Sequence, residues 1–378
     1  MTPSVAREMR ALFVNENIGG HATMHLGIRH ALAEHPEVEA EFLDAPDAGL
    51  LARVVRAPIP GLARLDLDLG PLRAQLARAT WIRRALQRRR DPYDVLHVYS
   101  QNAALMSVDR LRTSAAVVST DATGTLGASL MPNRAPSVGT ARRAAVAQRL
   151  ERRVFEASTI VVAQSDWTAR SLRDDYGIED DRLRVIPFGI IVPDVVRREP
   201  ATTSGLPEIT WVGTTMQRKG GRRLLELFRT RLRDRAVLNL VTRDDVDDEP
   251  GVQIHRDVYP NDGKLDAILA RTAVFAFPSE MDTFGYAALE AMARRVPVVG
   301  LRLHALPEII DDGVTGVLVD PADDDALAAA ILGLLDDPDA RDRMGEAARA
   351  RVLERFDARA TTAQLIDVLH EARERAGR

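Results

Sequence analysis

The chain has no cysteine among its 378 residues, and aromatic residues account for only 4% of it. The absence of cysteine excludes disulfide bonds and thiolate metal sites. The few aromatic side chains give no support to a surface on which nucleic-acid bases stack. Hydrophobic residues nevertheless make up 46% of the chain, which is enough to build two domains of ordinary size.

Long apolar segments are also missing. No apolar run reaches the ~18 residues that a membrane-spanning helix needs. The first residues, MTPSVAREMRALFV, lack the apolar core of a signal peptide. The 51 basic and 55 acidic side chains leave a net charge of −4, so we expect no nucleic-acid partner. The sequence therefore predicts a soluble, cytoplasmic protein.

Closely spaced metal ligands are not evident in the sequence either. Histidine and carboxylate residues form no tight cluster at the spacing of a metal site, and the acidic runs 244–249 and 311–312 have the composition of loops. We therefore expect no metal ion and no other cofactor.

What the chain does contain is a regular alternation of short buried strands and helical patterns, typical of an α/β fold with parallel sheets. In the first half, strands are expected at 10–15, 38–43, 95–99, 115–120, 159–163 and 183–188. In the second half, they are expected at 209–213, 236–241, 252–255, 273–277, 296–300 and 316–319. The pattern predicts two doubly wound, Rossmann-like domains facing across a cleft.

The domain boundaries are predicted from the break in this alternation. Residues 190–207, IIVPDVVRREPATTSGLP, are rich in Pro, Thr and Ser and have no clear period, so we predict a linker there. The linker would separate an N-terminal domain at 1–189 from a C-terminal domain at 208–357. A last helical stretch follows at 358–378.

The most informative string is FPSEMDTFGYAALEAMARRVPVVG, at 277–300. It predicts a buried strand, a polar loop with Gly285, a helix that carries Glu290, and a second buried strand. Asp282 and Glu290 would then lie at the carboxyl end of a strand and in the helix that follows, where ligands bind in α/β folds. Such a carboxylate pair can hold sugar and ribose hydroxyls beside a helix terminus that favours phosphate.

This string resembles the paired-acid motif of retaining glycosyltransferases of family 4, in which two Glu residues separated by seven other residues stand between Pro-Ser and Pro-Val-Val. Here Asp282 takes the place of the first Glu, and Glu290 that of the second. Glu280 is two residues out of register. The resemblance implies a GT-B fold and transfer, with retention, from a UDP- or GDP-sugar to a small-molecule, lipid or glycan acceptor. It also implies that the helix at 358–378 packs back on the first domain.

A second string, WVGTTMQRKGGRRLLELF, begins the C-terminal domain. Arg218 and Lys219 precede a Gly-Gly pair and a helix, where two cations can neutralise a departing diphosphate. Lys219 matches the lysine of the family pattern. Thr214 stands where many members have Arg, so Arg218 is our candidate for the missing guanidinium. The alternative is that both charges are simply solvated on a loop.

A third string, VNENIGGHAT, places Gly19 and Gly20 between the first strand and a helix. Glycine lets backbone N–H groups approach a diphosphate, and a tight turn needs glycine for steric reasons as well. Its position matches the donor loop of the family. His21 and His25 lie close by, and one of them could reach the sugar.

A fourth string, AAVVSTDATG, puts Asp121 directly after a strand. Relatives have His-Asp here, whereas this chain has Thr120 before Asp121. Asp121 could orient an acceptor hydroxyl or accept its proton, or it could simply cap the next turn. The sequence does not decide between these roles.

The resemblance then assigns the remaining roles. Glu290 would hold the ribose hydroxyls, and Asp282 would hold the donor sugar together with the backbone of Phe284 and Gly285. Lys219, Arg218 and the Gly19-Gly20 loop would stabilise the leaving diphosphate. Two other classes stay open: a sugar-nucleotide epimerase of related architecture, and a nucleotide-sugar-binding protein with impaired catalysis.

One amphipathic helix is predicted between Leu72 and Arg90, with many arginines on it. Such a helix can lie on an anionic membrane, and an ordinary surface helix of an Arg-rich protein has the same pattern. Peripheral contact with the inner face of the membrane is therefore one of two interpretations of this segment.

Overall fold

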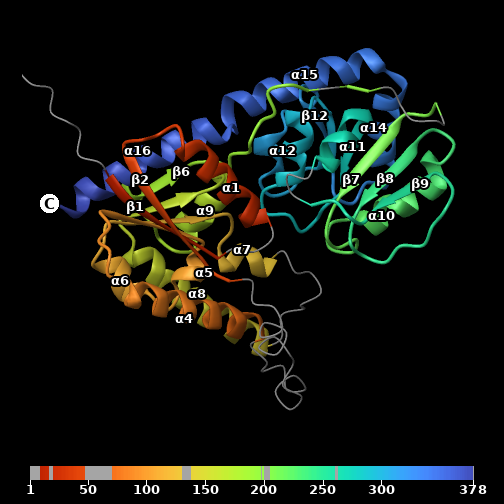
Figure 1. Ribbon diagram of the computed structural model, residues 1–378. Helices are drawn as coiled ribbons and strands as arrows, with labels where there is room; N and C mark the ends of the chain where they lie inside the picture. The colour runs from red at the N-terminus through yellow and green to blue at the C-terminus, as the bar shows by residue number, and fades with distance from the viewer. Residues whose placement is uncertain are drawn as a thin grey trace, which may run out of the picture. The chain divides into compact units, whose positions relative to one another are not determined.

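The computed structural model describes residues 9–16, 20–46, 70–129, 138–196, 198–199, 205–259 and 263–377. Two compact units make up the chain. One consists of Met1–Gly189 with Ala358–Arg378, and the other of Ile190–Asp357. Each unit is built on one parallel six-stranded sheet with helices on its faces, which confirms the predicted α/β class with two Rossmann-like domains (Figure 1).

The sheet of the first unit has the strand order β2-β1-β3-β4-β5-β6, with every pair parallel. Its strands are β1 (Met9–Asn15), β2 (Val38–Asp44), β3 (Val95–Tyr99), β4 (Ala116–Thr120), β5 (Ile160–Ala163) and β6 (Leu183–Val185). Most of these residues are buried, as expected of strands covered on both faces.

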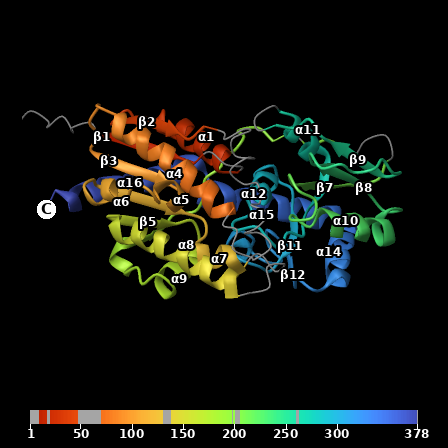
Figure 2. The ribbon, with the colours of Figure 1, turned by 90° about the horizontal axis from the view of Figure 1, so that it is seen from below.

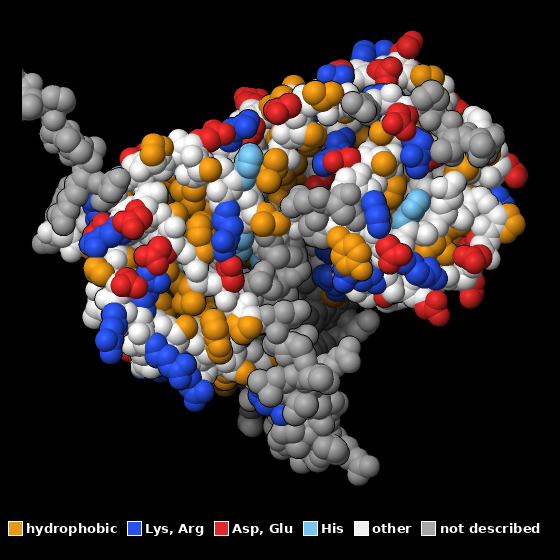
Figure 3. All heavy atoms as spheres, viewed as in Figure 1, with side chains coloured by type: hydrophobic (Ala, Val, Ile, Leu, Met, Phe, Trp, Pro, Cys, Tyr) orange, Lys and Arg blue, Asp and Glu red, His pale blue; other side chains and the backbone are white. Residues whose placement is uncertain are grey.

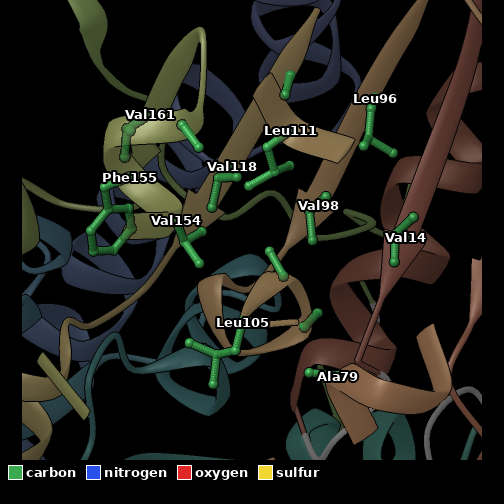
Figure 4. Packing of buried hydrophobic residues seen from close by; sticks show 14 of the residues in the cluster. Val14, Ala79, Leu96, Val98, Leu105, Leu111, Val118, Val154, Phe155 and Val161 are labelled. Carbon is green, nitrogen blue, oxygen red and sulfur yellow. The ribbon is translucent and has the colours of Figure 1, made fainter. Parts of the chain in front are cut away.

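The helices of the first unit cover both faces of this sheet. They are α1 (Gly20–Leu32), α4 (Gly70–Arg88), α5 (Gln101–Ala104), α6 (Val108–Arg112), α7 (Gly124–Ser129), α8 (Val138–Ala157), α9 (Asp166–Asp174) and α16 (Ala358–Ala376). In Figure 1, α1 and α16 lie above the sheet, and α4, α6 and α8 lie below it. The core on the lower side includes Val14, Ala79, Leu96, Val98, Leu105, Leu111, Val118, Val154, Phe155 and Val161 (Figure 4).

The sheet of the second unit is also parallel, in the order β12-β11-β10-β7-β8-β9. Its strands are β7 (Glu208–Val212), β8 (Val237–Val241), β9 (Val252–His255), β10 (Thr272–Phe277), β11 (Val298–Leu301) and β12 (Gly316–Val319). Its helices are α10 (Gly221–Leu227), α11 (Lys264–Arg271), α12 (Tyr286–Ala293), α13 (Leu306–Ile309), α14 (Asp324–Asp336) and α15 (Pro338–Arg355). Figure 2 shows α10 and α14 on one side of this sheet and α11 on the other.

All twelve predicted strands are present, with small differences at their ends. The strand expected at 183–188 ends at Val185, shortly before Pro187, which has no N–H to donate to a ladder. The strand expected at 296–300 begins at Val298, directly after Pro297, for the same reason.

Each sheet has a point at which the strand order reverses. In the first sheet the chain proceeds from β1 to β2 on one side, and then returns to β3 on the other side. In the second sheet, β7 lies between β8 and β10 in the same way. In α/β folds, ligands bind outside the carboxyl ends of the strands at such points.

The segment predicted as a linker, 190–207, lies in the second unit where the structure describes it. Ile190 forms a β-bridge with Asp357, and the N–H of Glu199 donates to the carbonyl of Ala270 at 2.9 Å. Arg349 donates to the carbonyl of Pro193 at 2.8 Å. Backbone groups of the segment thus hold its described part against the rest of the second unit.

Helix α16 belongs to the first unit, although more than 160 residues separate it from the preceding part of that unit. It packs against α1, β3 and β4. Its first turn comes very close to Gly189, where an added Cβ would lie 2.6 Å from the Cα of Ala358 and 2.1 Å from Oγ1 of Thr361. Only glycine fits at this contact without displacing the helix.

The apolar residues of α4 pack into the core of the first unit. Leu72, Ile82 and Leu86 are buried, whereas Trp81 is 39% exposed. Figure 3 shows Lys and Arg side chains on the surface in the region of α4 and α6. Within the described ranges, no helix combines the length and the apolar character needed to cross a bilayer. Membrane contact through α4 stays a prediction.

The contact at Gly189 can be tested by substitution. We expect Gly189→Ala to destabilise the protein by about 1–3 kcal/mol, because the new Cβ would overlap the backbone of α16. The matched control is Gly333→Ala in α14, where no atom lies within 4 Å of an added Cβ. That change should be neutral or stabilising by up to about 1 kcal/mol. Thermal unfolding of both variants measures the difference, and equal melting temperatures would contradict the packing described.

Candidate active site

The loop after β7 carries Lys219 and is held in place at several points. The indole N–H of buried Trp211 donates to the carbonyl of Lys219 at 3.0 Å. The N–H of Lys219 donates to the carbonyl of Thr215 at 3.1 Å. Asp244, which follows β8, accepts the N–H of Met216 at 2.6 Å. The backbone from which the lysine projects is therefore defined before any ligand binds.

Gly220 brings this loop against the loop that follows β10. Its φ of +74° is in the left-handed region, and an added Cβ would lie 1.9 Å from the carbonyl oxygen of Pro278. Both the dihedral and the contact require glycine. The Lys-Gly pair and the Pro-Ser pair of the two sequence motifs thus meet at the point where the second sheet reverses.

Lys219 and Asp282, 63 residues apart in the sequence, form an ion pair across these loops. Their side chains are only 18% and 17% exposed. The second carboxylate oxygen of Asp282, Oδ1, accepts the N–H of Gly285 at 3.1 Å and that of Phe284 at 3.4 Å. The structure therefore joins one predicted phosphate-binding residue to one predicted sugar-binding residue.

The neighbouring charges are arranged differently. Arg218 is exposed on the same loop. Glu280, two residues before Asp282, is 54% exposed and pairs with Arg223 at 3.3 Å. Glu280 thus pairs with Arg223 and not with Lys219. In the sequence, too, it lies two residues away from the position of the first motif acid.

Phe284 and Gly285 lie at the start of α12. The Phe284 side chain is buried, with its ring centroid 6.3 Å from that of Phe356. Gly285 precedes the helix with φ at +105°. The side chain of Phe284 is thus committed to packing, and only the backbone of this pair faces the loop that Asp282 caps.

Glu290 lies in the second turn of α12. Burial is the main cause that raises the pKa of its carboxyl to about 7; nearby Arg294 lowers this pKa and Asp266 raises it, and both effects are smaller. A carboxyl with this pKa is about half ionised near neutral pH. A raised pKa of this kind is common at functional sites.

The loop at the end of β4 carries Asp121 in the first unit. Thr168 donates through Oγ1 to the carbonyl of Asp121 at 2.5 Å. Thr120, which takes the place of the family's His, is fully buried, and its Oγ1 donates to the carbonyl of Ala122 at 3.0 Å. The buried Thr120 side chain therefore helps to fix the backbone of this loop through its hydrogen bond to Ala122.

His21, at the start of α1, lies between two carboxylates. Its Nε2 is 3.7 Å from Oδ2 of Asp121, and its Nδ1 is 3.0 Å from Oε1 of Glu16. Ser100, after β3, donates to Glu16 at 2.8 Å. These four residues follow β1, β3 and β4 or begin α1, so they gather at the reversal point of the first sheet. We call the three charged residues the Glu16–His21–Asp121 cluster, and Ser100 supports it through its hydrogen bond to Glu16.

The charge of His21 depends on this cluster. Burial disfavours the cationic ring, but hydrogen bonds and charge attraction from Asp121 and Glu16 outweigh it and raise the pKa of His21 to about 10. His25 and His97 differ, because burial without a carboxylate partner lowers their pKa values to about 2 and about 3. Of the two histidines that the sequence left open, His21 is the one next to Asp121.

The loop after Asp121 is anchored by Glu151, a residue of α8 that sequence reasoning missed. Glu151 accepts the N–H of Gly124 at 2.8 Å, the Tyr176 hydroxyl at 2.5 Å and the Gln101 side-chain amide at 3.2 Å. Burial raises the pKa of Glu151 despite these donors. Its only sequence signal is that it is one of two acids in an Arg-rich helix, which a solvated helix face would show as well.

The remaining sequence predictions can be placed more briefly. Gly20 begins α1, and Gly19 lies outside the described residues. No group of three or more His, Cys, Asp or Glu residues able to hold a metal ion occurs in the part of the chain that the structure describes.

The environment of His21 gives a pH prediction. A folded-state pKa raised from 6.5 to about 10 means that His21 stabilises the fold fully below about pH 6.5, and that this contribution is lost as the pH rises through 10. The stability difference between wild type and His21→Gln should therefore be larger at about pH 6 than at about pH 10.5. Chemical denaturation at the two pH values measures it.

A direct titration complements that measurement. Histidine NMR signals should show one imidazole that stays protonated far above 6.5, and Glu16→Gln should lower its pKa, because one of two attracting carboxylates is removed. An imidazole of His21 that titrates near 6.5 in the wild type would refute the ion-pair arrangement.

Known proteins share both the sequence patterns and the fold. The model of the glycosyl transferase 4-like domain matches residues 19–189, and that of the glycosyl transferases group 1 matches residues 196–351. The MMP alpha-(1->4)-mannosyltransferase of Mycolicibacterium hassiacum is 30% identical over 236 residues, which are 60% of this chain and 56% of that protein. The match thus spans little more than half of the relative's length.

Two solved structures show the same fold at low identity. Sucrose-phosphate synthase from Thermosynechococcus elongatus has a TM-score of 0.73 at 18% identity, with 96% of this chain and 98% of that chain covered. HepE from Anabaena, solved in complex with UDP-glucose, has a TM-score of 0.64 at 17% identity, with 96% and 100% covered. Together the two family models match most of the sequence, and this chain belongs to the family 4 type of glycosyltransferases with the GT-B fold.

Proposed function

We propose that this protein is a retaining glycosyltransferase, which moves a sugar from a UDP- or GDP-sugar to a hydroxyl group of an acceptor. The observation that carries the proposal is the meeting of Lys219 and Asp282 at the reversal point of the second sheet. A cation for the leaving diphosphate and an acceptor for sugar hydroxyls are thus available at one ligand-binding edge.

The comparisons support the class of reaction. The relative from Mycolicibacterium hassiacum is named a mannosyltransferase, and HepE was solved with UDP-glucose. The first name supports sugar transfer, and the second supports a nucleotide-sugar ligand.

The second unit would bind the donor. Lys219 and the exposed Arg218 would neutralise the diphosphate as the bond to the sugar breaks. Asp282, with the backbone of Phe284 and Gly285, would hold sugar hydroxyls. Because cationic side chains supply the charge that a metal ion supplies elsewhere, we propose a reaction without a divalent cation.

Glu290 would accept hydrogen bonds from the ribose hydroxyls. Its ionised form is the better acceptor, and burial holds its pKa near the working pH. Gly19 and Gly20, the latter at the start of α1, would add backbone N–H groups for the diphosphate.

The first unit would bind the acceptor through the Glu16–His21–Asp121 cluster. Asp121 would orient the acceptor by accepting a hydrogen bond from a hydroxyl next to the attacking one, while cationic His21 keeps that carboxylate oriented. The new bond forms between the acceptor oxygen and the sugar carbon as the sugar–phosphate bond breaks. The acceptor's proton passes to the departing phosphate oxygen, so attack and departure occur on the same face of the sugar.

The acceptor itself can be a small molecule, a lipid or a glycan in the cytoplasm. Contact with a membrane through α4 would have to use Trp81 and exposed arginines such as Arg84 and Arg88, because the apolar face of that helix packs into the core. Such contact would be peripheral.

The diphosphate role of Lys219 can be tested with a matched control. Lys219→Ala should reduce turnover by about 100-fold or more, because a charge that stabilises the leaving group is lost. Lys264, the other lysine of the sequence, donates to the carbonyl of Asp257 at 2.6 Å and is the control. Release of UDP or GDP with a panel of sugar donors and acceptors measures both variants, and wild-type turnover by Lys219→Ala would refute the assignment.

The same assay separates the alternative activities. Nucleoside diphosphate released only in the presence of an acceptor supports transfer. A changed sugar nucleotide without an acceptor would instead identify an epimerase, and binding without turnover would identify an inert binding protein.

The ribose role of Glu290 predicts a pH dependence. With a pKa of about 7, its ionised fraction rises about tenfold between pH 6 and pH 8, so the affinity for the nucleotide should rise by up to about tenfold over this interval. Calorimetry with UDP and with GDP at both pH values measures the change. Glu290→Gln should retain only the part that comes from the nucleotide's own titration, and an equally steep profile in that variant would exclude the role.

A further inference from the structure

Asp282 makes two kinds of contact at the same time. Its Oδ2 pairs with Lys219, and its Oδ1 accepts the N–H groups of Phe284 and Gly285. The three donors, Nζ of Lys219 and the N–H groups of Phe284 and Gly285, are groups of this loop pair that can bind an anion. In the free protein, therefore, a carboxylate of the chain already occupies them.

The shortness of the side chain explains this arrangement. An Asp side chain readily accepts N–H groups two and three residues ahead of it, as Asp282 does here, and it then stays close to its own loop. The contact of Gly220 with Pro278 fixes the distance across which Lys219 must reach. The pair is also largely shielded from water, because each side chain is less than one-fifth exposed.

We propose that Asp282 is an internal competitor for the diphosphate, and that it makes the site favour the intact sugar donor over the nucleoside diphosphate product. The inference rests on the proposed function, since it concerns the same donor site. Both ligands bring negative charge to Lys219, and the carboxylate of Asp282 repels both. The two ligands differ in the hydrogen bonds that they can donate to Asp282.

The donor offers sugar hydroxyls, which can donate hydrogen bonds to Asp282 and offset the repulsion. The product has no sugar, and its terminal phosphate carries additional negative charge near neutral pH, because the second ionisation of a phosphate monoester has a pKa of about 6. Asp282 therefore weakens product binding more than donor binding. Once the sugar has left, the carboxylate can pair with Lys219 again as the product departs.

The test compares anion binding in wild type and in Asp282→Asn. An Asn side-chain oxygen can still accept the N–H groups of the loop, but the negative charge is gone. Inorganic pyrophosphate is the first probe, because its binding depends on neither the base nor the sugar. We expect Asp282→Asn to bind pyrophosphate at least about tenfold more tightly than wild type by calorimetry, and the double variant with Lys219→Ala to lose this gain.

Glu280→Gln is the matched control. It removes a carboxylate from the same loop, but one that pairs with Arg223 and not with Lys219. Its pyrophosphate affinity should stay within about twofold of wild type. Unchanged or weaker pyrophosphate binding by folded Asp282→Asn would overturn the proposal. If that variant does not fold, Asp282→Ser, which keeps a smaller acceptor, replaces it with the same expectation.

Selectivity is measured with the pairs UDP and UDP-glucose, and GDP and GDP-mannose. In wild type the donor of the recognised pair should bind more tightly than its product, and in Asp282→Asn this order should be lost or reversed. An unchanged ratio would overturn the selectivity. If neither pair binds to wild type while pyrophosphate still responds to Asp282→Asn, the proposed function fails and the competition for Lys219 stands.

Discussion

The contact between Gly220 and the carbonyl of Pro278 is the constraint on which the candidate donor site depends. It holds the loop after β7 against the loop after β10, at the reversal point of the second sheet. Because the backbone approach is so close, Lys219 on one loop meets Asp282 on the other. The ion pair and the proposed competition with a diphosphate depend on this contact, whereas Asp282 caps the N–H groups of Phe284 and Gly285 within its own loop.

In the first unit, side-chain interactions rather than a backbone contact hold the candidate site residues in place. At its own reversal point, the polar groups of the Glu16–His21–Asp121 cluster hold one another, and Glu151 anchors the neighbouring loop from below. A cation between two carboxylates stays charged over a wide pH range. This cluster therefore offers an oriented carboxylate, whereas the second unit offers a shielded cation. In the proposed reaction, the carboxylate would orient the acceptor and the cation would stabilise the departing diphosphate.

Much of the fold could be predicted, because parallel strands buried on both faces leave continuous apolar runs in the sequence. All twelve strands and α16 were found in this way, with errors of a few residues beside Pro187 and Pro297. Asp121, Lys219 and Asp282 were predicted as site residues because they stand in loops that follow strands, and Glu290 because it matches the acid motif in the helix after β10. Their roles stay predictions. Glu151, Glu16 and Ser100 were not, since an isolated polar residue has the same signal whether it is solvated or buried.

By itself, the sequence determined the class of the fold and which residues stand at ligand-binding edges, because strand periodicity and glycine-rich turns are local properties. Only the tertiary structure decided how those residues pair. Lys219 neutralises Asp282, Glu280 turns to Arg223, and His21 rather than His25 joins Asp121. These pairings depend on distances between segments far apart in the chain and on burial, and neither is encoded in local spacing.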